Sequence, residues 1–450
     1  MGNGTAKLGR QQNAAPAGAR SVRAAVGNAA LKRARSRPAA MIGGAVGLAS
    51  LVAVIAPGLI AASAPAEVAA VPKYLDARAG VTMAAANGRT RIDYRRLDER
   101  LTIAASKPDI VGMAVAVIEN GEITFLKGYG VTQAAGGEPV GPQTVFRWAS
   151  LSKGVASTLV GLLAAEGRLS LDEPVARFST SLKLPNNGEQ TATIADILSH
   201  RVGIPHNASD NRLEAGADPR SLRQSLAAIA ASCTPGTCHS YQNIAFDTTT
   251  EVVERVTGQS YAEQVRRRLF APLGMRTASL TRAGLMAAQS WARPHVGRRT
   301  VEVNDNYYRV PAAGGVNSSI MDLALWMRAQ MGLAPQVVPP AVLANIHQAR
   351  VDTGRRGTLF SQVMGRSQYA LGWRDYDYSG RALVGHQGAV MGYRSTILFD
   401  PAARSGVAVL WNSQSGRPVG VQLEVLEMLY GQPPRDWLKI DGPAGAMAAQ

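Results

Sequence analysis

Residues 145–166 read VFRWASLSKGVASTLVGLLAAE, and the rest of the chain is best interpreted outward from them. Apolar side chains recur in this stretch at helical spacing, at Val155, Leu159, Leu162 and Leu163. The pattern predicts a buried helix over residues 151–166, with Ser150 at its start. Ser150 and Lys153 are three residues apart, so on a helix they face the same side, with about 5–6 Å between their Cβ atoms. The spacing therefore places an amine within reach of a hydroxyl.

This Ser-x-x-Lys pair has the chemistry of an activated nucleophile. A serine hydroxyl is a poor nucleophile until a neighbouring group takes its proton. Lys153 could do so only as a neutral amine, a state favoured by burial or by neighbouring positive charge. The helix dipole would also favour negative charge on the Ser150 oxygen. Taken alone, the pair also fits an exposed helix start with a capping serine.

The chain before this stretch predicts a helix and a β-hairpin. A helix is expected at residues 91–106, with apolar side chains able to share one face at Ile92, Leu97, Leu101 and Ile103. The apolar run at residues 111–118 is followed by Asn120-Gly121 and a second strand through residue 129. Asn-Gly between two such runs is a strong hairpin signal.

The C-terminal part returns to short strands after a helical middle region at residues 170–345. Strands are expected at residues 369–376, 381–384, 392–399 and 406–411, and a closing helix at residues 419–430. The strands of both chain ends would form one antiparallel sheet flanked by the N- and C-terminal helices, with the helical region inserted. This α+β fold would have a cleft between two lobes, with walls from loops around residues 205–225 and 285–312.

Two further motifs could complete a site at Ser150. Tyr241-Gln242-Asn243 supplies a phenol that can transfer a proton and an amide that can hydrogen-bond a substrate. Neither residue type is informative by itself, because a buried tyrosine with a satisfied hydroxyl is common.

The other motif is His386-Gln387-Gly388, at the end of an apolar strand segment and followed by Ala389. Glycine at this place lets a substrate backbone approach closely. The backbone amides of Ala389 and Ser150 could then stabilise a developing oxyanion.

The order and context of these three motifs resemble the penicillin-recognising serine hydrolases, specifically the class C β-lactamase-like family. Other stretches look like the same family: residues 198–203 (LSHRVG), 235–237 (PGT), 256–258 (VTG), 271–275 (APLGM) and 313–319 (AGGVNSS). The resemblance covers about residues 90–430. It implies an antiparallel sheet with terminal helices, packed against an all-helical region, with the three motifs meeting at the junction.

Carried over by position, the resemblance implies a role for each motif. Ser150 would be the acylated nucleophile, and Lys153 and Tyr241 would transfer protons, with either one as the general base. Asn243 would orient the substrate. The substrate-binding strand would contribute His386, Gly388 and Ala389. Such a site needs no metal or organic cofactor, because the serine, its bases and two backbone amides can carry the whole cycle.

One position departs from the β-lactamases and transpeptidases, in which the third motif begins with lysine. Lysine has a fixed positive charge that can bind a substrate carboxylate, whereas His386 is only partly charged near neutral pH. We therefore expect a serine hydrolase that acts on a small ester or a D-amino-acid-containing amide or peptide. One alternative is a β-lactamase or D-alanyl carboxypeptidase, in which Arg394 would replace the missing charge. Another is a non-catalytic, membrane-tethered penicillin-binding or sensing protein.

Much of the positive charge is concentrated at the N-terminus. The formal net charge is +16 over 450 residues, and residues 1–38 have eight basic and no acidic side chains. Residues 39–66 are uncharged and long enough to cross a bilayer, which takes about 20 apolar residues. Basic residues before such a segment predict a cytoplasmic N-terminus and a periplasmic or other extracytoplasmic remainder.

The N-terminal segment has two interpretations. Residues 39–66 could be a retained membrane anchor or a signal sequence cleaved near Ala64-Pro65-Ala66. Residues 67–90 would be a linker, residues 91–430 the hydrolase domain and residues 431–450 a C-terminal tail. Membrane topology and anionic lipid explain the basic segment, so no nucleic-acid partner is expected.

Cys233 and Cys238 are the only cysteines, and both would lie on the outward side, where disulfides persist. A local disulfide between them is the natural interpretation, and two unrelated buried thiols are the alternative. A zinc site is disfavoured, because no Cys or His pair elsewhere completes a ligand set with recognisable spacing.

Overall fold

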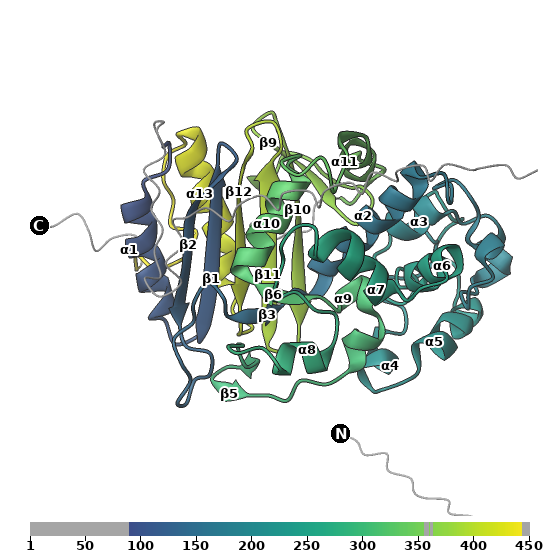
Figure 1. Ribbon diagram of the computed structural model, residues 1–450, viewed down its shortest axis with the longest axis horizontal. Coiled ribbons are helices and arrows are strands. Elements are labelled where there is room, and N and C mark those ends of the chain that lie inside the picture. The colour runs from purple at the N-terminus through teal and green to yellow at the C-terminus, as the bar shows by residue number, and fades with distance from the viewer. Residues whose placement is uncertain (1–89, 355–359, 361–362, 443–450) are drawn as a thin grey trace, which may run out of the picture. The chain divides into compact units, whose positions relative to one another are not determined.

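The computed structural model of the protein describes residues 90–354, 360 and 363–442 (Figure 1). The basic segment 1–38, the apolar segment 39–66 and all but the last residue of the linker 67–90 lie outside the described residues, so their roles stay predictions. Among the described helices, none has the length and apolar character needed to cross a membrane.

An eight-stranded antiparallel sheet forms the centre of the described structure (Figure 1). The strand order is β2-β1-β12-β11-β10-β9-β8-β7, so the N-terminal hairpin pairs directly with the last strand. Asn120 and Gly121 form the predicted hairpin turn with positive φ angles, which an Asn-Gly pair adopts readily. The strands are β1 (Gly112–Glu119), β2 (Glu122–Gly130), β7 (Val351–Asp352), β8 (Ser367–Tyr369), β9 (Arg374–Tyr378), β10 (Arg381–Val390), β11 (Tyr393–Asp400) and β12 (Ser405–Trp411).

Helices cover both faces of the sheet, which explains the apolar run of the first strand. Val115 of β1 packs in a cluster with α1 (Tyr94–Ala105) and α13 (Gly420–Tyr430). Its neighbour Ala114 belongs to the core on the other face, where α10 (Ile320–Gln330) crosses β1. Every residue of β1 is buried, as expected for a strand with two covered faces.

The helical region lies beside the sheet (Figure 1). Its α-helices are α2 (Ser152–Ala165), α3 (Ile194–Leu198), α4 (Asp210–Glu214), α5 (Pro219–Ser225), α6 (Thr248–Thr257), α7 (Tyr261–Val265), α8 (Arg282–Met286), α9 (Pro311–Gly314) and α11 (Pro340–His347). Short helical turns are η1 (Ala149–Leu151), η2 (Val175–Phe178), η3 (Pro185–Gln190, with a kink), η4 (Leu226–Ala228), η5 (Arg266–Phe270) and η6 (Asn306–Arg309), and η7 (Arg417–Val419) precedes α13 beside the sheet. Two small ribbons pair β3 (Val145–Arg147) with β6 (Asn317–Ser319) and β4 (His295–Val296) with β5 (Arg299–Thr300). The antiparallel sheet built from both ends of the chain, together with the inserted helical region, confirms the predicted α+β architecture.

Two expected strands differ from the structure near the site. The strand expected at residues 369–376 is instead two strands, β8 and β9, separated by a turn at Gly372. This glycine has φ +69° and lies so close to the backbone of Lys153 that a Cβ atom would clash with it. β10 continues past the expected end at residue 384 to Val390, because its pairing with β11 runs through the polar His386-Gln387-Gly388 motif.

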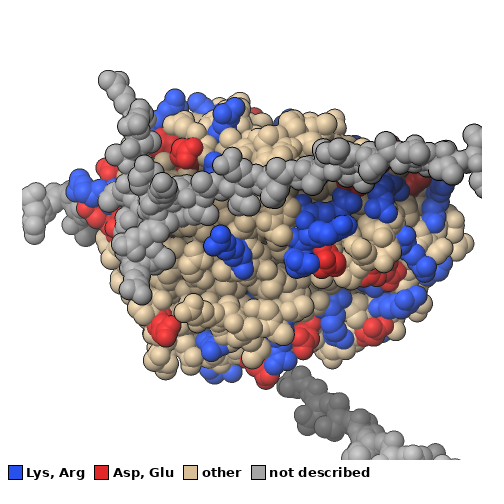
Figure 2. Space-filling model, viewed as in Figure 1, with Lys and Arg blue, Asp and Glu red and all other residues tan. Residues whose placement is uncertain are grey.

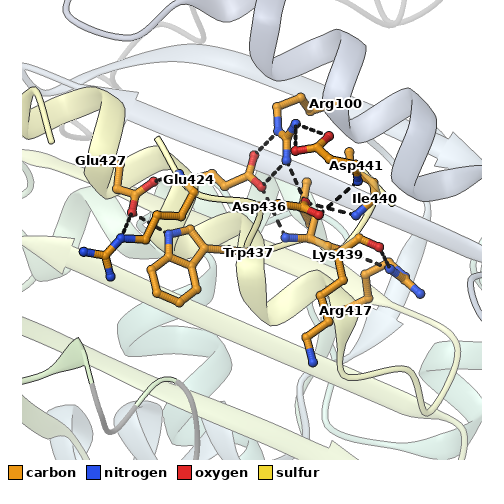
Figure 3. A network of polar contacts seen from close by, with 11 residues as sticks. Arg100, Arg417, Glu424, Glu427, Asp436, Trp437, Lys439, Ile440 and Asp441 are labelled. Atoms are coloured by element: carbon orange, nitrogen blue, oxygen red, sulfur yellow. Dashed lines mark hydrogen bonds and ion pairs between the residues drawn. The ribbon is translucent and has the colours of Figure 1, made fainter. Parts of the chain in front are cut away.

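The described part of the C-terminal tail is fastened to both terminal helices (Figure 3). Arg100 of α1 donates hydrogen bonds to Glu424 of α13 and to Asp436 and Asp441 of the tail. The Arg100 side chain is 12% exposed and that of Glu424 is 3% exposed, so this ion pair is largely shielded from water. One guanidinium therefore links the first helix, the last helix and the residues beyond it.

Charged side chains of both signs are scattered among uncharged residues on the face shown in Figure 2. Lys and Arg side chains are more numerous over the helical region than over the sheet, and Asp and Glu side chains lie among them. Residues 1–38 account for +8 of the net charge of +16, so the rest of the chain carries the other +8. This face therefore has a mixed charge pattern.

Candidate active site

Ser150 lies on the single turn η1, which leads directly into α2. The preceding residue, Ala149, has φ +49°, a left-handed conformation that is unfavourable for a residue with a Cβ and that is often found at functional sites. Ser152 supports this turn, because its Oγ donates to the Ala149 carbonyl oxygen at 2.6 Å and accepts from the Val316 amide at 3.0 Å. The turn holds the half-buried Ser150 side chain at the edge of the helical region.

Lys153 is fully buried beneath Ser150 and contacts three oxygen atoms. Its Nζ lies 3.2 Å from Ser150 Oγ, 2.7 Å from Asn243 Oδ1 and 2.9 Å from the Ala313 carbonyl oxygen. The Tyr241 ring covers another side, with its centroid 4.7 Å from Nζ. Each hydrogen of a protonated Lys153 would therefore have its own acceptor.

The burial of Lys153 prepares it to act as a base. Loss of hydration lowers the pKa of Lys153 to about 7, and the nearby carboxylates of Asp210 and Asp247 partly offset this effect. A neutral amine has two N–H donors and one lone pair. Since Asn243 Oδ1 and the Ala313 carbonyl oxygen take both donors, the lone pair faces Ser150 Oγ and can accept its proton.

Tyr241 and Asn243 reach this site from the loop before α6. Asn243 accepts from Lys153 through Oδ1 and donates through Nδ2 to Asp210 Oδ2 at 2.6 Å. These partners fix the orientation of the amide, and the second Nδ2 hydrogen can donate to a substrate carbonyl. The Tyr241 ring packs on His200, with 4.1 Å between the ring centroids.

β10 lies directly against the turn that carries the serine. A Cβ atom on Gly388 would clash with the Trp148 carbonyl oxygen and would lie 3.0 Å from the backbone nitrogen of Ser150. Ser395 of β11 donates to the same Trp148 carbonyl oxygen at 2.6 Å. The close approach of β10 to the backbone at Trp148 and Ser150 therefore requires glycine at position 388. The next residue, Ala389, lines the cleft together with Ser150.

Both ring nitrogens of His386 are hydrogen-bonded within the protein. Nδ1 lies 2.7 Å from the Gln387 carbonyl oxygen, which can only accept, so we assign the proton to Nδ1. Nε2 then accepts from the Tyr369 hydroxyl at 2.8 Å. That hydroxyl lies 3.1 Å from His200 Nε2, and His200 Nδ1 accepts from the Gln242 amide at 3.2 Å. A directed chain of hydrogen bonds thus runs from the Tyr241 loop to β10.

His386 is therefore a neutral group in this site. Burial lowers the pKa of His386 well below its ordinary value, and the positive charges of Arg374 and Lys153 lower it further. A neutral imidazole with both nitrogens engaged supplies no fixed charge for a substrate carboxylate. Arg394 is half-buried and lines the same cleft, with its Nε donating to the Gln414 carbonyl oxygen at 3.2 Å.

These side chains converge on a cleft of about 350 Å³. The predicted residues that line it are Ser150, Tyr241, Asn243, His386, Gly388 and Ala389, with Lys153 buried below. Further lining residues that no motif identified include His206, Asn207, Asp210, Glu214 and Tyr307. They come from the two segments expected to form the walls, where Asp210 and Glu214 lie on α4, but no spacing distinguished them from their polar neighbours.

Cys233 and Cys238 form a disulfide in the loop that leads to Tyr241. Across residues 90–354 and 363–442, no three His, Cys, Asp or Glu side chains are grouped so that they could hold a metal ion.

Comparisons with known proteins relate this chain to one family. Residues 95–431 match the protein family described as "Beta-lactamase". The unguisins hydrolase ungD of Aspergillus violaceofuscus is 28% identical, over 68% of this chain and 58% of that protein. A homologous unguisins hydrolase of Aspergillus campestris is 29% identical, over 68% of this chain and 59% of that protein. The chain thus spans about three fifths of the length of these curated relatives.

Solved structures share the fold at lower sequence identity. The octameric penicillin-binding protein homologue from Pyrococcus abyssi superposes with a TM-score of 0.69 and 24% identity, covering 77% of this chain and 80% of that one. A class C β-lactamase mutant superposes with a TM-score of 0.63 and 20% identity, covering 75% of this chain and 99% of that one. Because the family match extends over most of its length, the chain belongs to the β-lactamase family and has the β-lactamase/transpeptidase-like fold.

Proposed function

We propose that this protein is a serine hydrolase that forms a covalent acyl-enzyme at Ser150 on a small ester or a D-amino-acid-containing amide or peptide. The observation that carries this proposal is the environment of Lys153. Its amine is buried, its pKa is lowered to about 7, and two fixed acceptors leave its lone pair facing Ser150 Oγ. A buried amine with a lowered pKa in contact with a serine hydroxyl is the arrangement that proton transfer from that serine requires.

In the proposed acylation, the neutral Lys153 takes the Ser150 hydroxyl proton while Oγ bonds to the substrate carbonyl carbon. The negative charge that develops on the carbonyl oxygen is stabilised by the backbone amides of Ser150 and Ala389. The bond to the leaving group then breaks, and the leaving group receives a proton from Lys153 or through the Tyr241 hydroxyl. In deacylation, Lys153 or Tyr241 takes a proton from water, and the water oxygen bonds to the acyl carbonyl carbon. The bond between that carbon and Ser150 Oγ then breaks, and Oγ receives a proton, which restores the hydroxyl.

Because His386 is neutral, we expect the enzyme to prefer esters and amides to substrates whose own carboxylate must be bound by a cation at this position. Both of its nitrogens are used within the protein, so a substrate carboxylate would find no fixed cation there. Substrates whose scissile carbonyl is held mainly by backbone amides and by Asn243 fit this environment better.

The relatives support the hydrolase proposal in its general form. Two of them have the name unguisins hydrolase, which describes their activity and not the activity of this chain. Family membership together with the Ser150–Lys153 contact favours turnover over a purely binding or sensing role.

A second candidate is a β-lactamase or D-alanyl carboxypeptidase, and one observation favours it. Arg394 lines the cleft and could bind a substrate carboxylate in place of the missing lysine. The two candidates differ in the substrates that they would turn over, so one set of assays separates them.

We also propose that the hydrolase domain faces an oxidising, extracytoplasmic compartment. The Cys233–Cys238 disulfide supports this location, because disulfides persist in such compartments. Protease added to spheroplasts, whose cytoplasmic membrane is intact, should digest an outward-facing domain, and digestion that begins only after lysis would contradict the proposal.

The test compares the full chain with its Ser150→Ala variant on a short-chain chromogenic ester, a D-alanyl amide and a penicillin. We expect turnover of the ester or the amide by the wild type and near-total loss in the variant. Full activity of a folded Ser150→Ala variant would contradict the assignment of the nucleophile. Turnover of penicillin above the other two would favour the second candidate.

A further inference from the structure

The wall of the cleft formed by α4 carries two carboxylates. Asp210 and Glu214 are four residues apart at the two ends of this helix, so they lie on the same side of it. Both line the cleft together with Ser150. Within the described residues, neither carboxylate forms an ion pair with a Lys, Arg or His side chain. The wall therefore carries two carboxylates without a direct ion pair, and Lys153 beneath it acts electrostatically on Asp210.

Asp210 is almost completely buried, and only one of its carboxylate oxygens has a hydrogen-bond partner. Oδ2 accepts from Asn243, whereas Oδ1 is buried with no partner among the described residues. Asp210 is only 8% exposed, and this burial raises its pKa to about 6, so it is still mostly ionised at neutral pH. A buried carboxylate oxygen without a donor is unfavourable, and such groups in a cleft are candidates for ligand contacts.

Glu214 lies at the surface of the same wall and is held in place by η6. Its Oε1 accepts from the Tyr307 hydroxyl at 3.0 Å, and its backbone carbonyl accepts from Asn306 Nδ2 at 2.7 Å. The second carboxylate oxygen, Oε2, has no hydrogen-bond partner in the described part of the chain. A ligand cation at this wall would therefore meet an exposed carboxylate with a second, buried one behind it.

We propose that Asp210 and Glu214 bind a positively charged amino group of the substrate. This proposal rests on the hydrolase function proposed above and names its substrate class: aminoacyl esters, amides or short peptides with a free α-amino group. The reaction is the same acyl transfer, in which the carbonyl carbon exchanges its leaving group for Ser150 Oγ, and the amino group stays unchanged.

The position of the wall explains why the amino group would be the one next to the scissile carbonyl. Asp210 contacts Asn243, Asn243 contacts Lys153, and Lys153 contacts Ser150 Oγ. Only two side chains therefore separate the buried carboxylate from the nucleophile. An α-ammonium group is the cation nearest to a peptide or aminoacyl carbonyl, and Asp210, Glu214 and Ser150 line the same cleft, so this is the group that the wall would bind.

The test uses matched substrates that differ in one charge. The full chain is assayed with D-alanine p-nitroanilide and D-alanine benzyl ester, and with the N-acetylated form of each. We expect the free-amine form to have the higher kcat/KM in each pair. Glu214→Gln should lower the ratio of free-amine to acetylated kcat/KM about tenfold, since a charge-assisted hydrogen bond is replaced by a neutral one. The ratio should also fall with added salt.

Glu254→Gln is the matched control, because Glu254 is exposed on α6 outside the cleft and the substitution removes the same charge. It should leave the ratio unchanged. Equal kcat/KM for the charged and acetylated forms, or the same ratio in Glu214→Gln as in the wild type, would overturn the proposal.

A binding measurement separates failure of this proposal from failure of the hydrolase function. In the Ser150→Ala variant, calorimetric titration should show tighter binding of D-alaninamide than of N-acetyl-D-alaninamide. Equal affinities would overturn the amino-group site even if a neutral ester is hydrolysed. Tighter binding of the free amine without turnover of any ester or amide by the wild type would support the site and count against the hydrolase proposal.

Discussion

Replacement of Lys153 by methionine should change how the stability of the protein depends on pH. In the folded protein burial lowers the pKa of Lys153 from 10.5 to about 7, whereas in the unfolded chain the side chain regains water. Between these two values the unfolded state binds more protons than the folded state. The free energy of unfolding of the wild type should therefore rise with pH in this window, and Lys153→Met should lack this rise.

The expected size follows from the two pKa values. One pKa unit corresponds to about 1.4 kcal/mol. The free energy of unfolding of the wild type minus that of Lys153→Met should therefore increase by about 2 kcal/mol from pH 7 to pH 9. Asp210 and Asp247 also face Lys153, and loss of its positive charge would raise their pKa values. With raised pKa values, these carboxyls would stabilise the folded variant at the lower pH by binding protons. The stability of the variant would then fall as pH rises, which further increases the wild-type-minus-variant difference.

Guanidinium unfolding followed by tryptophan fluorescence at pH 7, 8 and 9 measures this difference. Lys439→Met removes an exposed lysine and serves as the control, whose difference from wild type should stay small. The same ionisation should govern acylation, so kcat/KM for a neutral ester should rise with pH around a midpoint near 7. A flat difference between wild type and Lys153→Met would mean that Lys153 stays protonated in the folded protein, which would refute its role as the base.

Three further substitutions test the supporting structure. Gly388→Ala should keep the protein folded but lower kcat/KM by about 100-fold, because the new Cβ displaces β10 from the serine; retained kcat/KM would contradict this. Cys233→Ser should lower the free energy of unfolding by about 2 kcal/mol, a loss that reductant should reproduce in the wild type but not in the variant. Arg223→Met should destabilise by about 3–5 kcal/mol, because it leaves buried Asp247 without its cation, and an unchanged denaturation midpoint would argue against this pair.

The architecture was predictable because its signals are local. The Asn-Gly turn, the apolar runs and the helical spacing after Ser150 each depend on neighbouring residues, and all three elements are present. The buried face of the first helix was harder to predict from the sequence. Ile103 was expected on its buried face but is 47% exposed, because Tyr94 and Ala104 occupy the buried positions with Leu97 and Leu101.

The chemistry of the site was only partly predictable, because much of it depends on contacts between distant segments. The Ser150–Lys153 spacing indicated a nucleophile and its base. The hydrogen bond that occupies His386 Nε2 comes from Tyr369, and the fixed orientation of Asn243 follows from Asp210. Both partners lie in stretches without a motif, so only the folded structure brings them to the site.

The most direct test of the central claim is to identify the residue that becomes acylated. The wild-type protein is mixed with a chromogenic ester, quenched in acid during turnover, digested and analysed by mass spectrometry. We predict one acyl group on the peptide that contains Ser150 and no acylated peptide in the Ser150→Ala variant. An acyl group on another residue, or turnover by the wild type with no covalent intermediate at Ser150, would contradict the proposed mechanism.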